Sequence, residues 1–103
     1  MSGWIKVGPL EAIEDEDVMR FDHAGHRYAV YRVRGQVYAT DGLCTHEQAP
    51  LYDGLVMDHV IECPKHNGRF DIRDGRALRA PACVGLKTYA AKIEGGDIYL
   101  LPG

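Results

Sequence analysis

The amino-acid sequence predicts an all-β fold. Short runs rich in Val, Ile, Tyr and Thr recur along the chain, and turn-forming residues interrupt them about every eight to twelve positions, which is typical of short strands joined by tight turns. Helix-like composition is confined to the acidic stretch Glu11–Asp17, which could form one helical turn or a solvated loop. No repeat or linker divides the chain, so we expect a single domain over residues 1–103.

Turn residues place the expected strands in order along the chain. Hairpin turns are expected at Gly25 between His23 and His26, at Arg34-Gly35, at Asp74-Gly75 and at Gly95-Gly96. The expected strands are Arg27–Val33, Gln36–Thr40, His59–Glu62, Phe70–Ile72, Ala77–Leu78, Lys87–Ile93 and Asp97–Leu101.

Composition excludes several classes of function. The net charge of -3 gives no strong electrostatic signal for binding nucleic acid or an anionic membrane. The sequence shows neither a signal peptide nor an apolar stretch of membrane-spanning length, so we expect a cytoplasmic protein. Three cysteines, at positions 44, 63 and 83, are too few for a disulfide framework, which favours metal binding for some of them.

Two segments, at about residues 42–50 and 63–70, lack the strand pattern and are predicted to be loops. The first contains Cys44-Thr45-His46, the second contains Cys63-Pro64-Lys65-His66, and sixteen residues separate His46 from Cys63. Each predicted loop therefore offers one thiolate and one imidazole. A 2Fe-2S cluster with two thiolates on one iron and two imidazoles on the other needs both loops to reach both irons, and this is the Rieske type of ligation.

On these residues the chain resembles the Rieske family, and in particular the small ferredoxins of bacterial aromatic ring-hydroxylating dioxygenase systems. The resemblance extends to Gly68, Phe70, Asp71 and the segment Pro81-Ala82-Cys83. It implies a Rieske-like antiparallel β-sandwich with a small cluster-binding subdomain made of the two loops. It also implies that Cys44, His46, Cys63 and His66 bind one 2Fe-2S cluster.

The function implied by the resemblance is one-electron transport without a catalytic site. The expected partners are an NAD(P)H-dependent flavoprotein reductase, which donates electrons, and a terminal oxygenase of aromatic hydrocarbon catabolism, which accepts them. A chain of 103 residues has no room for a second domain with the mononuclear iron of an oxygenase. We expect the carrier to be a monomer.

Two alternatives remain open at the level of sequence. The small Rieske subunit of an assimilatory nitrite reductase shares the implied fold. A structural zinc ion also takes two Cys and two His, as in a zinc-stabilised interaction module, although zinc fingers usually pair Cys with Cys and His with His within each half of the site.

The resemblance also indicates a low reduction potential within the Rieske range of about -150 to +300 mV. High-potential relatives carry two further cysteines in these loops, as well as a serine and a tyrosine that donate hydrogen bonds to sulfur. The matching positions here are Glu47 to Ala49 and Lys65 for the cysteines, Gly68 for the serine and Phe70 for the tyrosine. Without those donors the reduced cluster is less stabilised.

The remaining candidates have simpler expected roles. Cys83 is expected to pack as a small hydrophobic residue, and Lys65 to lie exposed beside the cluster. We expect surface or hydrogen-bonding roles for His23, His26 and His59, a backbone role for Gly68, and packing for Trp4 and the six tyrosines.

Overall fold

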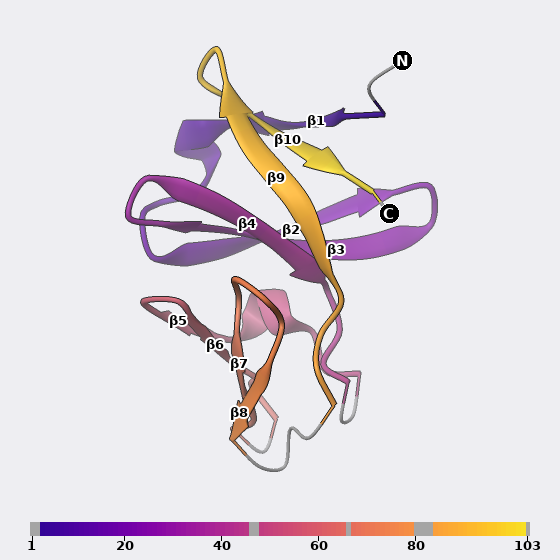
Figure 1. Ribbon diagram of the computed structural model, residues 1–103, viewed down its shortest axis with the longest axis vertical. Helices are drawn as coiled ribbons and strands as arrows, with labels where there is room; N and C mark the ends of the chain where they lie inside the picture. The colour runs from indigo at the N-terminus through magenta and orange to yellow at the C-terminus, as the bar shows by residue number, and fades with distance from the viewer. Residues whose placement is uncertain (1–2, 46–47, 66, 80–83, 103) are drawn as a thin grey trace.

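The computed structural model describes residues 3–45, 48–65, 67–79 and 84–102, which form two antiparallel sheets (Figure 1). In the larger sheet six strands are ordered β1-β10-β9-β4-β3-β2, and in the smaller sheet four strands are ordered β5-β6-β7-β8. The strands are β1 (Ile5–Pro9), β2 (Asp17–His23), β3 (His26–Val33), β4 (Gln36–Asp41), β5 (Leu55–Met57), β6 (Val60–Glu62), β7 (Arg69–Asp71), β8 (Ala77–Arg79), β9 (Thr88–Glu94) and β10 (Asp97–Leu101). The predicted all-β, antiparallel fold is therefore confirmed.

Strand β3 joins the two sheets because both of its faces are buried. Ala29, Tyr31 and Val33 pack against the smaller sheet, together with Ile61 of β6 and other apolar residues. The alternate residue Val30 packs inside the larger sheet. A strand covered on both sides has no polar face, which explains the nearly continuous apolar run from position 28 to position 33.

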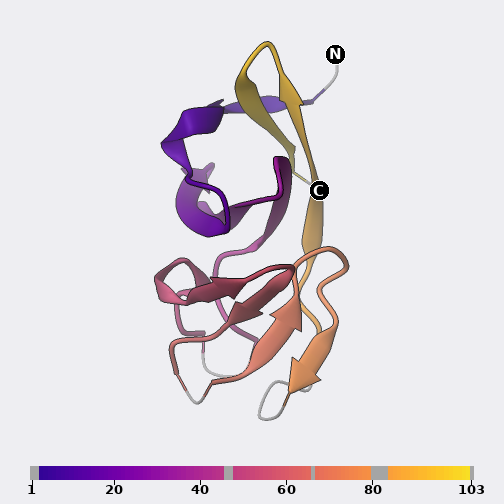
Figure 2. The same ribbon diagram turned by 90° about the vertical axis from the view of Figure 1, so that its left-hand side faces the viewer.

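The larger sheet curls until its two edge strands share one apolar interior. Val7 of β1, Met19 and Phe21 of β2, and Ile98 of β10 belong to the same cluster as Val30. Figure 2 shows β1 and the β9–β10 hairpin arching over the strands of the other edge. The curl provides a packed base on which the smaller sheet rests.

The two predicted loops leave the strands at the end of the molecule far from the N-terminus (Figures 1 and 2). The first follows β4 and leads through the 3-10 turn η2 (Leu51–Asp53) to β5, whereas the second joins β6 to β7. The predicted range of about 63–70 was too long for the second loop, because β7 already begins at Arg69.

Hairpin chemistry identified the turns correctly. Gly25, Arg34-Gly35, Asp74-Gly75 and Gly95-Gly96 all lie between paired neighbouring strands. At Arg34-Gly35 the φ angles are 53° and 75°, and two positive φ angles give a turn that matches the right-handed twist of the strands. Glycine is favoured at the second position because it adopts this conformation without steric cost.

Several element boundaries differ from the prediction. His59 lies in the turn before β6 and not in the strand, Ile72 lies just beyond β7, and β9 begins at Thr88. The predicted turn in the stretch Glu11–Asp17 is a 3-10 turn, η1 (Leu10–Ala12), and β2 already begins at Asp17. Strands β1, β2 and β5 were not predicted. Packing is confirmed for Tyr28 and Tyr31, which are buried, and for Tyr38 and Tyr89, which are partly buried and pack against the core clusters. Trp4, Tyr52 and Tyr99 are partly exposed.

Candidate metal centre

The first candidate loop begins where β4 ends. The Cys44 amide donates a hydrogen bond of 2.7 Å to the Ala49 carbonyl, which closes the loop upon itself. At the base of the loop, the Gly42 amide donates to the Arg27 carbonyl of β3, and the Leu51 amide donates to the Gly42 carbonyl. The loop is thereby attached to the larger sheet, and the Cys44 side chain is buried, with 2% of the residue exposed.

The second candidate loop is closed in the same way. The Cys63 amide donates a hydrogen bond of 2.7 Å to the Gly68 carbonyl, and Cys63 is 1% exposed. In both loops the bond runs from a cysteine to the residue five positions later. The left-handed conformation in this loop lies at Asn67, whose φ is 58°. Gly68 is buried, and its carbonyl accepts the hydrogen bond that closes the loop.

The structure brings the two candidate thiols into one apolar cluster. Cys44 and Cys63 share it with Leu51, Ile61 and Phe70, and each of these five residues is at most 2% exposed. Sulfur donors buried in an apolar environment fit a cluster that must be shielded from water. His46, His66, Glu47 and Cys83 lie outside the described residues, and the described part of the chain contains no group of three metal-binding side chains. Lys65 is exposed, as expected.

A third segment, which contains Val84 and Leu86, is attached to both the first loop and the smaller sheet. These contacts were not predicted from the sequence. The Thr45 hydroxyl donates a 2.7 Å hydrogen bond to the Val84 carbonyl. The Leu86 amide donates to the Gly75 carbonyl at 2.7 Å. Gly75 has a φ of 80°, and a Cβ atom there would lie 2.0 Å from the Leu86 oxygen, so this approach requires glycine.

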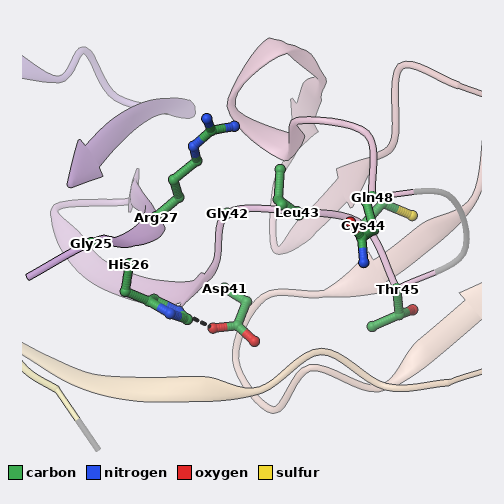
Figure 3. Close-up of a pocket in the computed structure, with 9 residues that line it drawn as sticks. All are labelled: Gly25, His26, Arg27, Asp41, Gly42, Leu43, Cys44, Thr45 and Gln48. Carbon is green, nitrogen blue, oxygen red and sulfur yellow. Dashed lines mark hydrogen bonds and ion pairs between the residues drawn. The ribbon is translucent and has the colours of Figure 1, made fainter. Parts of the chain in front are cut away.

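Polar side chains connect the base of the first loop to three strands of the larger sheet. The Asp41 carboxylate, at the end of β4, accepts a 2.5 Å hydrogen bond from the Tyr89 hydroxyl and lies 2.7 Å from Nε2 of His26. Burial and the neighbouring carboxylate raise the pKa of Tyr89. His26 and Asp41 line a cavity of about 400 Å³ that extends to Cys44 and Gln48 (Figure 3). This network fixes the position at which the chain enters the first loop.

Asp71 organises the turn between β7 and β8. Its carboxylate is buried and accepts hydrogen bonds from the backbone amide and the guanidinium of Arg73, with distances of 2.8 to 3.0 Å. Its backbone amide donates to the Arg76 carbonyl. The hydrogen bonds from Arg73 hold the pKa of the Asp71 carboxyl below its usual value, although burial acts in the opposite direction. The aspartate is therefore charged in the folded protein near neutral pH.

Comparison with known proteins identifies the family. Residues 3–90 match the model of the Rieske [2Fe-2S] domain. The chain belongs to this family. Its cofactor is therefore a single 2Fe-2S cluster of the Rieske type. The predicted family and cofactor are confirmed, and the zinc-stabilised module is disfavoured.

Among its relatives, this Rieske chain is 48% identical to the ferredoxin component of the naphthalene 1,2-dioxygenase system of Pseudomonas aeruginosa, over 94% of this chain and 93% of that protein. Its fold matches the ferredoxin of carbazole 1,9a-dioxygenase from Nocardioides aromaticivorans IC177, with a TM-score of 0.94, 32% identity and coverage of 99% and 100%. A carbazole 1,9a-dioxygenase ferredoxin in complex with its oxygenase matches with a TM-score of 0.92, 33% identity and coverage of 98% and 94%.

These relatives are electron-carrying components and not catalysts, so the Rieske chain is a ferredoxin, the electron-carrying component of such a system. The ferredoxin interpretation is favoured over the nitrite reductase subunit. No helix in the described part of the chain is long and apolar enough to cross a membrane.

Proposed function

We propose that this ferredoxin receives single electrons from an NAD(P)H-dependent flavoprotein reductase and delivers them to the terminal oxygenase of an aromatic ring-hydroxylating system. Cys44 and Cys63 would bind one iron, and His46 and His66 the other. The observation that carries the proposal is the matched pair of loops, each closed by a cysteine amide bonded to a carbonyl five residues later. The 48% identity to the ferredoxin component of a naphthalene 1,2-dioxygenase system supports the same electron-carrying role.

The bound cluster supplies reversible one-electron chemistry at a potential that its ligands and surroundings set. The chain's own residues supply the environment. Leu51, Ile61 and Phe70 exclude water from the two thiols. The hydrogen bond that Thr45 donates and the one that Asp41 accepts hold the first loop against its neighbours. Loops held in this way reorganise little when charge arrives or leaves, which favours rapid electron transfer.

A low potential follows from the side chains near the cysteines. Gly68 is buried and has no side-chain donor, and Phe70, which is 0% exposed in the same cluster as both thiols, has no hydroxyl. Donors aimed at sulfur stabilise the reduced state, so their absence at these two positions favours a low potential. Because its potential is low, the carrier accepts an electron from the reductase with a modest driving force. It then donates this electron readily to the oxygenase.

The proposal is tested by reconstitution. The purified holoprotein is mixed with NADH and with the reductase and terminal oxygenase of a naphthalene 1,2-dioxygenase system, and dihydroxylated product is measured with and without the ferredoxin. We expect product only when the ferredoxin is present. A red-brown protein with a Rieske electron paramagnetic resonance signal that supports no product would contradict the proposed partners but not the cofactor.

The ligand assignment has its own test. Each of Cys44, His46, Cys63 and His66 is replaced singly by Ala, and iron content and the resonance signal are measured. Each variant should lose the signal. A variant that keeps a normal Rieske signal would remove that residue from the ligand set.

A further inference from the structure

Charge is distributed unevenly along this ferredoxin. Residues 63–79, which include the second loop and the β7–β8 hairpin, contain five basic and two acidic side chains, a formal charge of +3 in a chain whose total is -3. The basic residues are Lys65, Arg69, Arg73, Arg76 and Arg79. A positive region on an acidic protein can steer a negatively charged partner toward one face.

The same region presents an apolar groove on the outer face of the smaller sheet. Its inner face is formed by Val56, Ile61 and Phe70, which pack in the buried cluster with the cysteines. The alternate positions face outward. Met57, Val60 and Leu78, together with the stems of Arg69 and Arg79, line a cavity of about 330 Å³.

The groove combines exposed apolar surface with available positive charge. Leu78 is 43% exposed, so its side chain is available for an apolar contact with another molecule. Arg69 lies 2.8 Å from the Glu62 carboxylate, so its charge is partly compensated. Within the described residues Arg79 is exposed and forms no ion pair. Its guanidinium is thus able to bind a carboxylate of another molecule.

The groove lies directly beside the second loop in the chain. Strand β6 ends at Glu62, one residue before Cys63, and β7 begins at Arg69, one residue after Gly68. A protein seated in the groove would therefore also cover the surface of this loop. A contact that extends from a loop end to the side of a sheet fixes the orientation of the partner better than contact at the loop end alone.

We propose that the groove of Met57, Val60, Leu78, Arg69 and Arg79 is a docking surface for an acidic redox partner, which inserts an aliphatic or aromatic side chain between the arginines and pairs a carboxylate with Arg79. A second copy of this chain fits less well, because its equivalent face carries the same positive charge. The small area suits a transient complex. The inference rests on the proposed electron-carrier function.

Two variants test the groove separately. Leu78→Ser removes the apolar contact, and Arg79→Glu reverses the charge at an exposed site. The matched controls lie on the larger sheet: Ile93→Ser, at a residue 36% exposed, and Lys6→Glu, at a side chain 59% exposed. Lys6→Glu loses only a surface ion pair to Asp97, and it changes the net charge by the same amount as Arg79→Glu.

The probes are the reductase and the terminal oxygenase of a naphthalene 1,2-dioxygenase system. Stopped-flow absorbance follows reduction of the ferredoxin by the first and its reoxidation by the second. In at least one step, Arg79→Glu should lower the second-order rate constant about threefold or more at low salt, and the loss should shrink at high salt. Leu78→Ser should lower it about as much at both salt concentrations, and the controls should react like the parent.

Three outcomes would count against the docking surface. Groove variants that match the parent in both steps, with the parent active, would overturn the docking surface while leaving the proposed function intact. A loss equal in Lys6→Glu and Arg79→Glu would also overturn it, because net charge alone would then explain the effect. A parent that reacts with neither protein would count against the proposed function and the groove together. If Leu78→Ser fails to hold the cluster, the second-order rate constant of Arg79→Gln, at the exposed neighbouring position, decides in its place. A value equal to that of the parent would overturn the docking surface.

Discussion

The two sheets of this ferredoxin differ in the length of their strands and in the contacts that stabilise them. Strands of the larger sheet are five to eight residues long, and its edges share an apolar interior. Every strand of the smaller sheet has three residues. Ladders this short are marginal without further support. The smaller sheet obtains that support from β3 beneath it, from the closed loops and from the Gly75–Leu86 contact.

From this difference we expect the two sheets to depend on the cofactor to different degrees. We predict that the stability of the larger sheet does not depend on the cofactor, whereas the smaller sheet and its loops depend on the cluster to tie them together. Metal ligation that joins two loops contributes directly to folding free energy. Changes at equivalent kinds of side chain should therefore have different consequences in the two regions.

The largest effect is expected from removing a proposed ligand. His66→Ala or Cys63→Ala should abolish the cluster, because one iron then loses one of its two proposed protein ligands. Hydrogen exchange of the resulting apoprotein should show protection retained in β3, β4 and β10 and lost in β5 to β8. Equal loss of protection in both sheets would contradict the expected difference between them.

The control for that experiment is the third cysteine. Cys83→Ser should keep the colour and the resonance signal, with a cost in stability below about 1.5 kcal/mol, because the four proposed ligands are other residues. Iron loss from this variant would mean that Cys83 takes part in cluster binding.

The next effect is expected at Asp71, in the turn of the smaller sheet. Asp71→Asn removes the charge that Arg73 contacts and should cost about 2 kcal/mol of unfolding free energy at pH 7, a typical value for a hydrogen bond to a charged group. The folded-state pKa of Asp71 is lowered, so its contribution is present above its unfolded pKa of about 3.9 and is lost as the pH falls through the folded value.

Urea titrations of the parent and Asp71→Asn measure this contribution at a series of pH values. The difference between the two proteins should be constant near neutral pH and should shrink below about pH 4. A difference that does not change with pH would show that the charge of Asp71 is not responsible.

A smaller effect, on potential, is expected at the buried aromatic of the smaller sheet. Phe70→Tyr introduces a hydroxyl into the cluster that contains both cysteines. If the hydroxyl reaches a sulfur and contributes about 1 kcal/mol in favour of the reduced state, the potential should rise by roughly 40 mV. Protein-film voltammetry measures it, and an unchanged potential with an intact spectrum would refute the role given to the missing donor.

The smallest effect is expected from removing a buried hydroxyl in the larger sheet, which is the reverse of the change at Phe70. The Tyr31 hydroxyl forms a 2.8 Å hydrogen bond with Thr40 of the neighbouring strand β4, and Tyr31→Phe should cost about 1 kcal/mol in stability. The potential should stay that of the parent. A shift as large as that of Phe70→Tyr would show that the two sheets do not differ in their influence on the cluster.

Much of this architecture could be read from local sequence. The turns at Arg34-Gly35 and Gly95-Gly96 were predictable because glycine adopts the required positive φ angles. Strand β3 was predictable from its β-branched and aromatic residues. The pair of Cys and His loops was predictable because ligand chemistry demands those residue types at close spacing, and family membership agrees with it.

Other features depend on residues far apart in the chain. Strand β5 has only three residues, Leu55–Met57, and such a run carries too little pattern to distinguish a strand from a loop. Its inclusion in a sheet depends on pairing with β6 and packing on β3. The 3-10 turn at Leu10–Ala12 is likewise set partly by the Leu10 amide, which donates to the Gly96 carbonyl on the distant β9–β10 turn.

The sequence alone thus determined the all-β class and the hairpin turns, and it predicts the donor set of the cluster, because each depends on the local conformational or chemical preference of a few adjacent residues. Only the tertiary structure decided which remote groups hold the first loop: Tyr89 on Asp41, 48 positions away, and Val84 on Thr45, 39 positions away. It also placed Met57 and Leu78 on one outer face. These contacts arise from the order of strands in the two sheets, which no local preference specifies.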